Sequence, residues 1–214
     1  MTLIPEDGNF TTESRPETKR SETHSSVQAA DAERFNQEAL TYLIRGELNS
    51  ESGVSCPPPA LAEVADAAEQ GSNAKGVPCF SNARIHFEFA VAAATLFGPC
   101  EIDGIPGINL PPGSNQTVAI TIHGDHLFFN GFPEGSEGGI VRLAQWLADC
   151  DLNVDGRVSQ AELQSIAPSD LSEIDERFQL GGSPISPLGN MWDYLTSQLK
   201  TQGHYQGEGE CPYN

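Results

Sequence analysis

The alternation of apolar and polar residues predicts the clearest strand of this chain at residues 84–91. Side chains two positions apart project from the same face of a strand, so one apolar face is expected to point into the core. That face carries Ile85, Phe87, Phe89 and Val91. His86 and Glu88 fall on the opposite, polar face.

Two further segments are predicted to form strands. Residues 117–123 alternate in the same way, and Val118, Ile120 and Ile122 are expected to face inward. Residues 39–48 alternate less regularly, but their Thr, Tyr and Ile content slightly favours a strand over a helix. Because Gly- and Pro-rich turns separate these short strands, the pattern predicts a small antiparallel sheet or sandwich.

Helical periodicity dominates the second half of the chain. Apolar residues recur at i, i+3, i+4 and i+7 within residues 140–147, and Leu163 and Ile166 continue an apolar face until Pro168. An amphipathic helix is predicted to close the fold at residues 190–199. Shorter helices are expected at residues 28–36, at the Ala-rich residues 60–69, and from Ser169, which we predict to be an N-cap.

Between the two helices around residue 150, oxygen-bearing side chains recur at a fixed spacing. They occupy positions one, three, five, nine and twelve of a loop: Asp151, Asn153, Asp155, Ser159 and Glu162. Gly156 stands at position six, where the turn needs a positive φ, and Arg157 at position seven would offer its backbone carbonyl. Ser159 would hold a water and Glu162 would bind bidentately, which suits a Ca²⁺ ion. The alternative is an acidic helix–helix loop without an ion.

This loop resembles the EF-hand family over residues 139–167, and the resemblance implies calcium ligation by the loop residues named above. Two features depart from the family: no second loop is found in the chain, and Cys150 replaces the usual large apolar residue before the loop. Val158, at position eight, must therefore pair with another strand or another molecule. More loosely, the chain is similar to secreted bacterial EF-hand proteins and lipoproteins of unknown activity.

These observations predict an α+β fold, with a small antiparallel β-sandwich or sheet followed by a helical region with a single EF-hand. We expect a disordered or linker tail at residues 1–27 and a β-rich domain at residues 28–135. The helical EF-hand region, residues 136–214, is expected to pack on that domain.

The amino-acid composition disfavours two classes of binding partner. The chain has 214 residues, with 11 Lys and Arg against 30 Asp and Glu, and a net charge of −19. Nucleic acids and anionic membrane surfaces select basic patches, so both are disfavoured as partners. No apolar run approaches the length of a transmembrane helix.

Five cysteines are spaced without any zinc-binding pattern. We expect two disulfides and one remaining cysteine, with Cys56 paired to Cys79 across a Pro-rich stretch, whereas Cys100, Cys150 and Cys211 cannot be paired from sequence. Disulfides would place the protein in an oxidising compartment: secreted, periplasmic or on the cell surface. The alternative is five buried thiols in a cytosolic protein.

Histidines suggest a second kind of metal site. If the strands at 84–91 and 117–123 pair, His86, His123 and His126 converge with Asp125 or Glu88. Imidazole ligands suit Zn²⁺ or Cu²⁺. The alternative, which we favour at this point, is separate histidines that hydrogen-bond to the backbone.

No catalytic or cofactor-binding motif is present, which favours a non-enzymatic protein. We therefore expect a secreted calcium-binding protein whose ion is structural, acting as a binding or assembly module with a protein partner. The alternative is a Cu- or Zn-binding protein or metalloenzyme that uses the three histidines.

Overall fold

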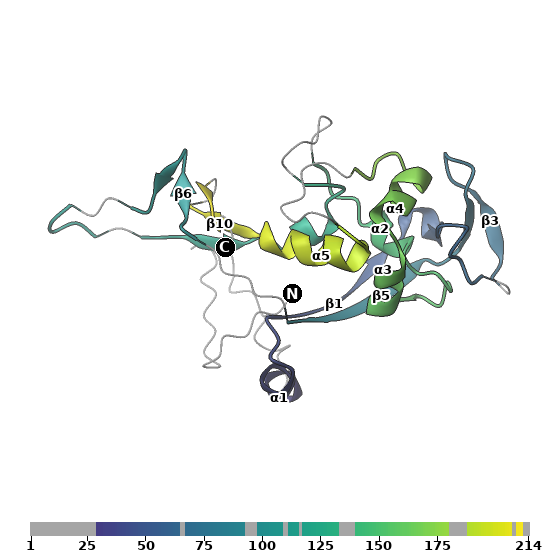
Figure 1. The fold of residues 1–214 in the computed structure, drawn as a ribbon, viewed down its shortest axis with the longest axis horizontal. Helices are drawn as coiled ribbons and strands as arrows, with labels where there is room; N and C mark the ends of the chain where they lie inside the picture. The colour runs from purple at the N-terminus through teal and green to yellow at the C-terminus, as the bar shows by residue number, and fades with distance from the viewer. Residues whose placement is uncertain are drawn as a thin grey trace.

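The computed structural model describes residues 29–64, 67–92, 98–108, 111–115, 117–132, 140–179, 188–206 and 209–211. These residues form an α+β fold, as predicted (Figure 1). The helices are α1 (Ala29–Glu38), α2 (Gln145–Ala148), α3 (Gln160–Ser165), α4 (Pro168–Ile174) and α5 (Met191–Lys200), with 3-10 turns η2 (Glu51–Gly53) and η3 (Gly124–Phe128). The strands are β1 (Tyr42–Asn49), β2 (Val54–Ser55), β3 (Glu69–Ser72), β4 (Pro78–Ser81), β5 (Arg84–Val91), β6 (Glu101–Ile102), β7 (Ile105–Pro106), β8 (Ile120–Ile122), β9 (Arg157–Val158), β10 (Gly203–Tyr205) and β11 (Gly209–Glu210).

The strands form three small sheets, ordered β1-β5-β9, β2-β4-β3 and β7-β6-β11-β10-β8. The five-stranded sheet lies at one end of the molecule, at the left of Figure 1, and α5 leads into it. Two of the three sheets combine strands from before and after residue 135. The proposed division of the chain at that residue stays a prediction.

The antiparallel strands β1 and β5 form one side of the hydrophobic core. All eight residues of each strand are in antiparallel register, from Tyr42 opposite Val91 to Asn49 opposite Arg84. The predicted inward face of β5 is confirmed, because Ile85, Phe89 and Val91 are at most 2% exposed. The opposite face carries ion pairs to α1, including one between Arg45 and Asp31 at 2.7 Å.

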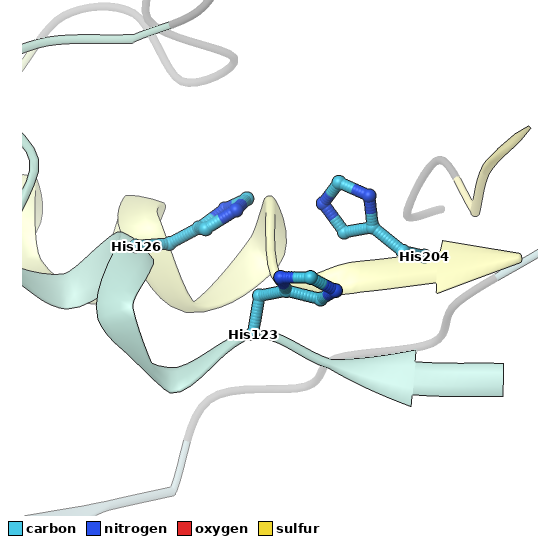
Figure 2. A group of neighbouring side chains, drawn as sticks. All are labelled: His123, His126 and His204. Carbon is cyan, nitrogen blue, oxygen red and sulfur yellow. The ribbon is translucent and has the colours of Figure 1, made fainter. Parts of the chain in front are cut away.

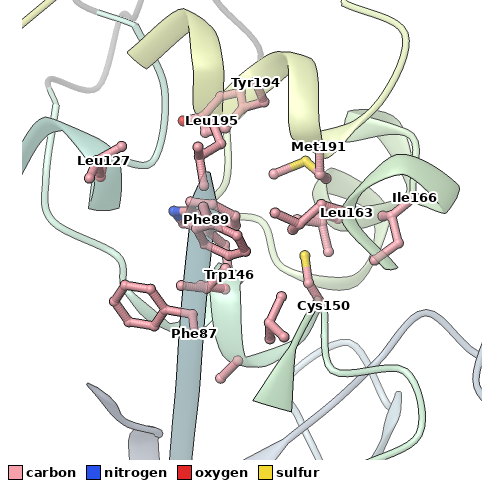
Figure 3. Packing of buried hydrophobic residues seen from close by; sticks show 14 of the residues in the cluster. Phe87, Phe89, Leu127, Trp146, Cys150, Leu163, Ile166, Met191, Tyr194 and Leu195 are labelled. Carbon is pink, nitrogen blue, oxygen red and sulfur yellow. The ribbon is translucent and has the colours of Figure 1, made fainter. Parts of the chain in front are cut away.

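Helices cover the inner face of this pair. Figure 3 shows Phe89 between side chains of α5 and Trp146 of α2. Tyr194 is fully buried, its ring lies 5.0–5.6 Å from three other aromatic rings, and its hydroxyl donates to the Phe129 carbonyl at 2.8 Å. The predicted closing helix is therefore confirmed, and Asn190 caps it by accepting from the Asp193 amide at 3.0 Å.

Three secondary-structure predictions are wrong. The Ala-rich segment is not a helix in its described part. The amides of Leu61 and Ala62 both donate to the Pro58 carbonyl and form a single turn, and strand β3 begins at Glu69. Nucleating a helix is unfavourable, and the alanines add little apolar surface to the contact that Leu61 makes with the core. Residues 140–144 are not helical, because the amide of Leu143 and the carbonyl of Val141 bond to the backbone of residues 128–130 instead.

In the third case, the N-cap of α4 is Ala167, two residues before the predicted Ser169. Pro168 is the first residue of the helix, a position where the missing N–H costs nothing, so Ser169 lies within the first turn and is not the N-cap. The predicted inward face of residues 117–123 is also wrong, because Val118 and Ile120 are 44% and 61% exposed. Strand β8 pairs with β10 at the edge of the five-stranded sheet, which we call the terminal sheet, away from the core.

Candidate metal sites

Three histidines meet where the five-stranded sheet joins the helical part of the molecule. His123 precedes η3, His126 lies within it, and His204 is the middle residue of β10. Ligand atoms of the three side chains all lie within 4.8 Å of one another. Figure 2 shows the three rings around a shared space. Among the His, Cys, Asp and Glu side chains of the described residues, no other group of three is this close, so this group can hold a metal ion.

Backbone pairing brings these histidines together. His204 lies opposite Thr121 in the β8–β10 ladder, and the His123 amide donates to the Gln202 carbonyl at 2.9 Å. The turn of η3 then returns His126 toward His123, whose carbonyl accepts from the His126 amide at 3.2 Å. The positions of the rings therefore follow from main-chain contacts.

His126 is the most constrained of the three. It is 6% exposed, its ring lies 4.4 Å from that of Phe129, and its Nδ1 lies 2.9 Å from the Thr201 hydroxyl. Burial, with the neighbouring His204 and His123, lowers the pKa of His126 to about 4. The ring is therefore neutral at pH 7, which is the form that binds metals.

Asp125 does not join this group. Its Oδ2 accepts two hydrogen bonds from the Arg142 guanidinium, at 2.9 and 2.5 Å, and its Oδ1 is 3.9 Å from His123 Nδ1. Burial alone would raise the pKa of Asp125, but the contacts with Arg142 outweigh it and lower the pKa.

His86 is also absent from the group, contrary to the convergence considered from sequence. The strand β5 pairs with β1 and β9, not with β8, so the condition for that convergence fails. The His86 Nδ1 lies 3.5 Å from Glu47, and both side chains are partly exposed. His204 was missed because nothing in the local sequence around residue 204 indicates pairing with residues 120–122, and only the tertiary fold reveals it.

The predicted calcium loop lies at the other end of the core. It leads from α2 into α3 through β9, and Gly156 has a φ of +81° at the predicted turn. The amide of His86 donates to the Gly156 carbonyl at 2.8 Å, and Val158 lies opposite Phe87 in a parallel pairing. The predicted partner of Val158 is therefore confirmed as a protein strand, β5.

The loop carboxylates accept hydrogen bonds from the loop's own N–H groups. Asp151 accepts from the amides of Asp155 at 3.2 Å and Gly156 at 2.8 Å. Glu162 accepts from Leu152 at 3.0 Å and, in a capping box, from Ser159 at 2.8 Å. The Ca²⁺ ligands predicted at Asn153, Asp155, Arg157 and Ser159 lie on the same short loop, and the Asn153 and Ser159 oxygens accept from backbone amides.

Asp151 is fully buried. Burial raises the pKa of Asp151, and the opposing hydrogen bonds from Asn82 and the loop amides do not outweigh it. Within the described part of the chain, Asp151, Asp155 and Glu162 form no ion pair with a Lys, Arg or His. Glu63, from the Cys56–Cys79 loop, lines the same surface depression as Asn153, Asp155 and Glu162. Arg157 lines this depression as well, but no ion pair joins its guanidinium to these carboxylates among the described residues.

The cysteines follow the sequence prediction. Cys56 and Cys79 are bonded as expected, Cys100 pairs with Cys211, and Cys150 remains a free, buried thiol. Burial raises the pKa of the Cys150 thiol well above its usual value, so the thiol is protonated and inert at neutral pH.

No protein-family model, curated protein or solved structure matches this chain. Among the described residues, none of the helices combines the length and apolar character that a bilayer span requires. The two disulfides are compatible with an oxidising, extracellular compartment.

Proposed function

We propose that this protein is a secreted calcium-binding module in which one Ca²⁺ ion at residues 151–162 has a structural role. The observation that carries the proposal is Asp151, a fully buried carboxylate at position one of a loop with calcium-ligand spacing. Burying a carboxylate without a cation is unfavourable, whereas a divalent ion would neutralise it together with Asp155 and Glu162.

Ion binding would stabilise more than the loop. Asn82, in the link between β4 and β5, donates to Asp151 at 2.8 Å, and the Glu63 amide donates to the Leu152 carbonyl at 2.8 Å. Strand β9 adds the pairing with His86 and Phe87. A Ca²⁺ ion would therefore hold strand β5, the Cys56–Cys79 loop and helix α3 against one another, which is a structural role.

A calorimetric titration of the chelator-treated full chain with Ca²⁺ tests this proposal. We expect one ion per chain with a Kd on the order of 10⁻⁴ M, a range found in extracellular modules. In a parallel NMR titration, the His86 amide should shift together with residues 151–162, because it bonds to the loop carbonyl. Asp155→Ala should weaken binding, and Glu173→Ala, at an exposed site on α4, should not. A wild-type chain that gives no binding heat and no amide shifts with millimolar Ca²⁺ would contradict the proposal.

We further propose that the protein acts non-enzymatically, as a binding or assembly module. Support comes from four large apolar side chains exposed on or beside the terminal sheet: Ile102, Ile105, Val118 and Ile120. Ile102 and Ile105 lie opposite each other in the β6–β7 pairing, and adjacent exposed apolar side chains can form a contact with a partner protein. Sedimentation analysis over a wide concentration range tests self-assembly, and a monomer at every concentration would count against it.

A further inference from the structure

We propose that His123, His126 and His204 form a site for a transition-metal ion that prefers imidazole ligands, Zn²⁺ or Cu²⁺. This site goes beyond the calcium function, because it shares no residue with the loop at 151–162. The proposal rests on convergence: ring centroids lie 4.2 Å apart for His123 and His204, and 5.1 Å apart for His126 and His204. His123 and His126 are 5.7 Å apart.

The spacing is close to what coordination requires. A Zn–N bond of about 2.0–2.1 Å places tetrahedral ligand atoms about 3.3 Å apart. The three ligand atoms already lie within 4.8 Å of one another, so small side-chain rotations would complete the site without moving the main chain. The two rings nearer the surface, His123 and His204, are only partly buried and can make that adjustment.

One ring already has a partner that can orient it for coordination. The Thr201 hydroxyl lies 2.9 Å from the Gln198 carbonyl, to which it can donate, and 2.9 Å from His126 Nδ1, from which it can accept. In this arrangement the His126 proton is on Nδ1, and Nε2 keeps its lone pair for a metal. An orienting partner on the second ring nitrogen is typical of metal-binding histidines.

The ligand set selects the class of ion. Three neutral nitrogens suit Zn²⁺ and Cu²⁺ and are poor ligands for Ca²⁺ or Mg²⁺, which require oxygens. Asp125, the nearby carboxylate, is held by Arg142. Three protein ligands leave a fourth position for water or an external ligand.

The test is competitive titration of the full, metal-free chain with Zn²⁺ and Cu²⁺ against a chromophoric chelator. We expect one high-affinity equivalent in the wild type and at least a tenfold loss in His123→Ala, His126→Ala and His204→Ala. His86→Ala is the matched control, because His86 lies on β5 beside Glu47, and it should bind as the wild type does. Excess Ca²⁺ should not displace the ion, which separates this result from the calcium proposal.

Two further measurements guard against misfolded variants and surface binding. Thermal melts of the metal-free variants establish that each is folded, and Thr201→Val, which keeps all three imidazoles, should still weaken binding by about 10–100-fold. The electron paramagnetic resonance spectrum of the Cu²⁺ form should show coupling to three nitrogens. Equal affinity of the wild type and the folded triple variant His123→Ala/His126→Ala/His204→Ala would overturn the proposal, as would a spectrum unchanged by that substitution.

Discussion

Replacing Glu162 by Gln removes one negative charge from the proposed calcium loop while largely preserving the shape of the side chain. Glu162 accepts hydrogen bonds from Leu152 at 3.0 Å and from Ser159 at 2.8 Å, and a Gln side chain can accept one of these through its carbonyl oxygen. The lost bond costs about 0.5–1.5 kcal/mol. That cost is the same with and without calcium, so the change in stability caused by the ion isolates the contribution of the carboxylate.

The expected calcium effect follows from mass action. With a Kd of about 10⁻⁴ M, 1 mM Ca²⁺ raises the free energy of unfolding by about 1.4 kcal/mol. A tenfold weaker Kd in Glu162→Gln leaves about 0.4 kcal/mol. For a domain of this size, these energies correspond to increases in Tm of about 3–6 °C in the wild type and about 1–2 °C in the variant.

Thermal unfolding followed by circular dichroism, in 1 mM Ca²⁺ and in EGTA, measures both increases. Glu173→Gln serves as the control, because it removes an equal charge at an exposed position of α4. Its increase should match that of the wild type. Equal increases in the wild type and in Glu162→Gln, or no increase in either, would refute the assignment of Glu162 as an ion ligand.

Three more predictions concern the fold. Phe89→Ala should lower the free energy of unfolding by about 3–5 kcal/mol in urea denaturation, because Phe89 is 1% exposed and packs on Trp192; a loss below 1 kcal/mol would contradict its central place in the core. Replacing Cys56 and Cys79 by Ser should cost about 3 kcal/mol in the same assay, because the bond closes a loop with a sequence separation of 23. Burial tends to raise the pKa of Asp175, but hydrogen bonds from Arg177 prevail and the pKa is lowered in the folded state. The ion pair therefore stabilises the fold above the unfolded pKa of about 3.9, and this contribution is lost as pH falls through the lower folded value. Asp175→Asn should flatten that acid limb of the stability–pH profile, and an unchanged profile would refute the linkage.

Local patterns were sufficient where one face of an element is buried. The alternation at residues 84–91 and the periodicity at 190–199 predicted β5 and α5, because burial of Phe89 and Tyr194 imposes the same period on sequence and structure. The failure at residues 60–69 has the opposite cause. Tertiary contacts override the high helix propensity of alanine, and hydrogen bonds to Pro58 and to Leu152 of the proposed calcium loop decide the conformation there.

The two candidate metal sites also differ in how far the sequence alone reveals them. The proposed calcium loop is contiguous, so its spacing is visible in the sequence, whereas the histidine group joins residues from two distant segments. Its third member, His204, is placed by the β8–β10 pairing and by the return of the chain to the disulfide between Cys100 and Cys211, across a sequence separation of 111. No local pattern carries that information, because strand pairing of this kind depends on the whole topology.

The two-residue strand β9 has a consequence for self-association. One edge of β5 is covered along its whole length by β1, but on the other edge β9 pairs only with His86 and Phe87. Unpaired strand edges recruit strands from other molecules, and short covering segments prevent this. Any condition that loosens residues 151–162 would uncover this edge and favour intermolecular β-pairing. If the proposed Ca²⁺ ion orders this loop, chelators should promote aggregation of the protein before they promote its unfolding.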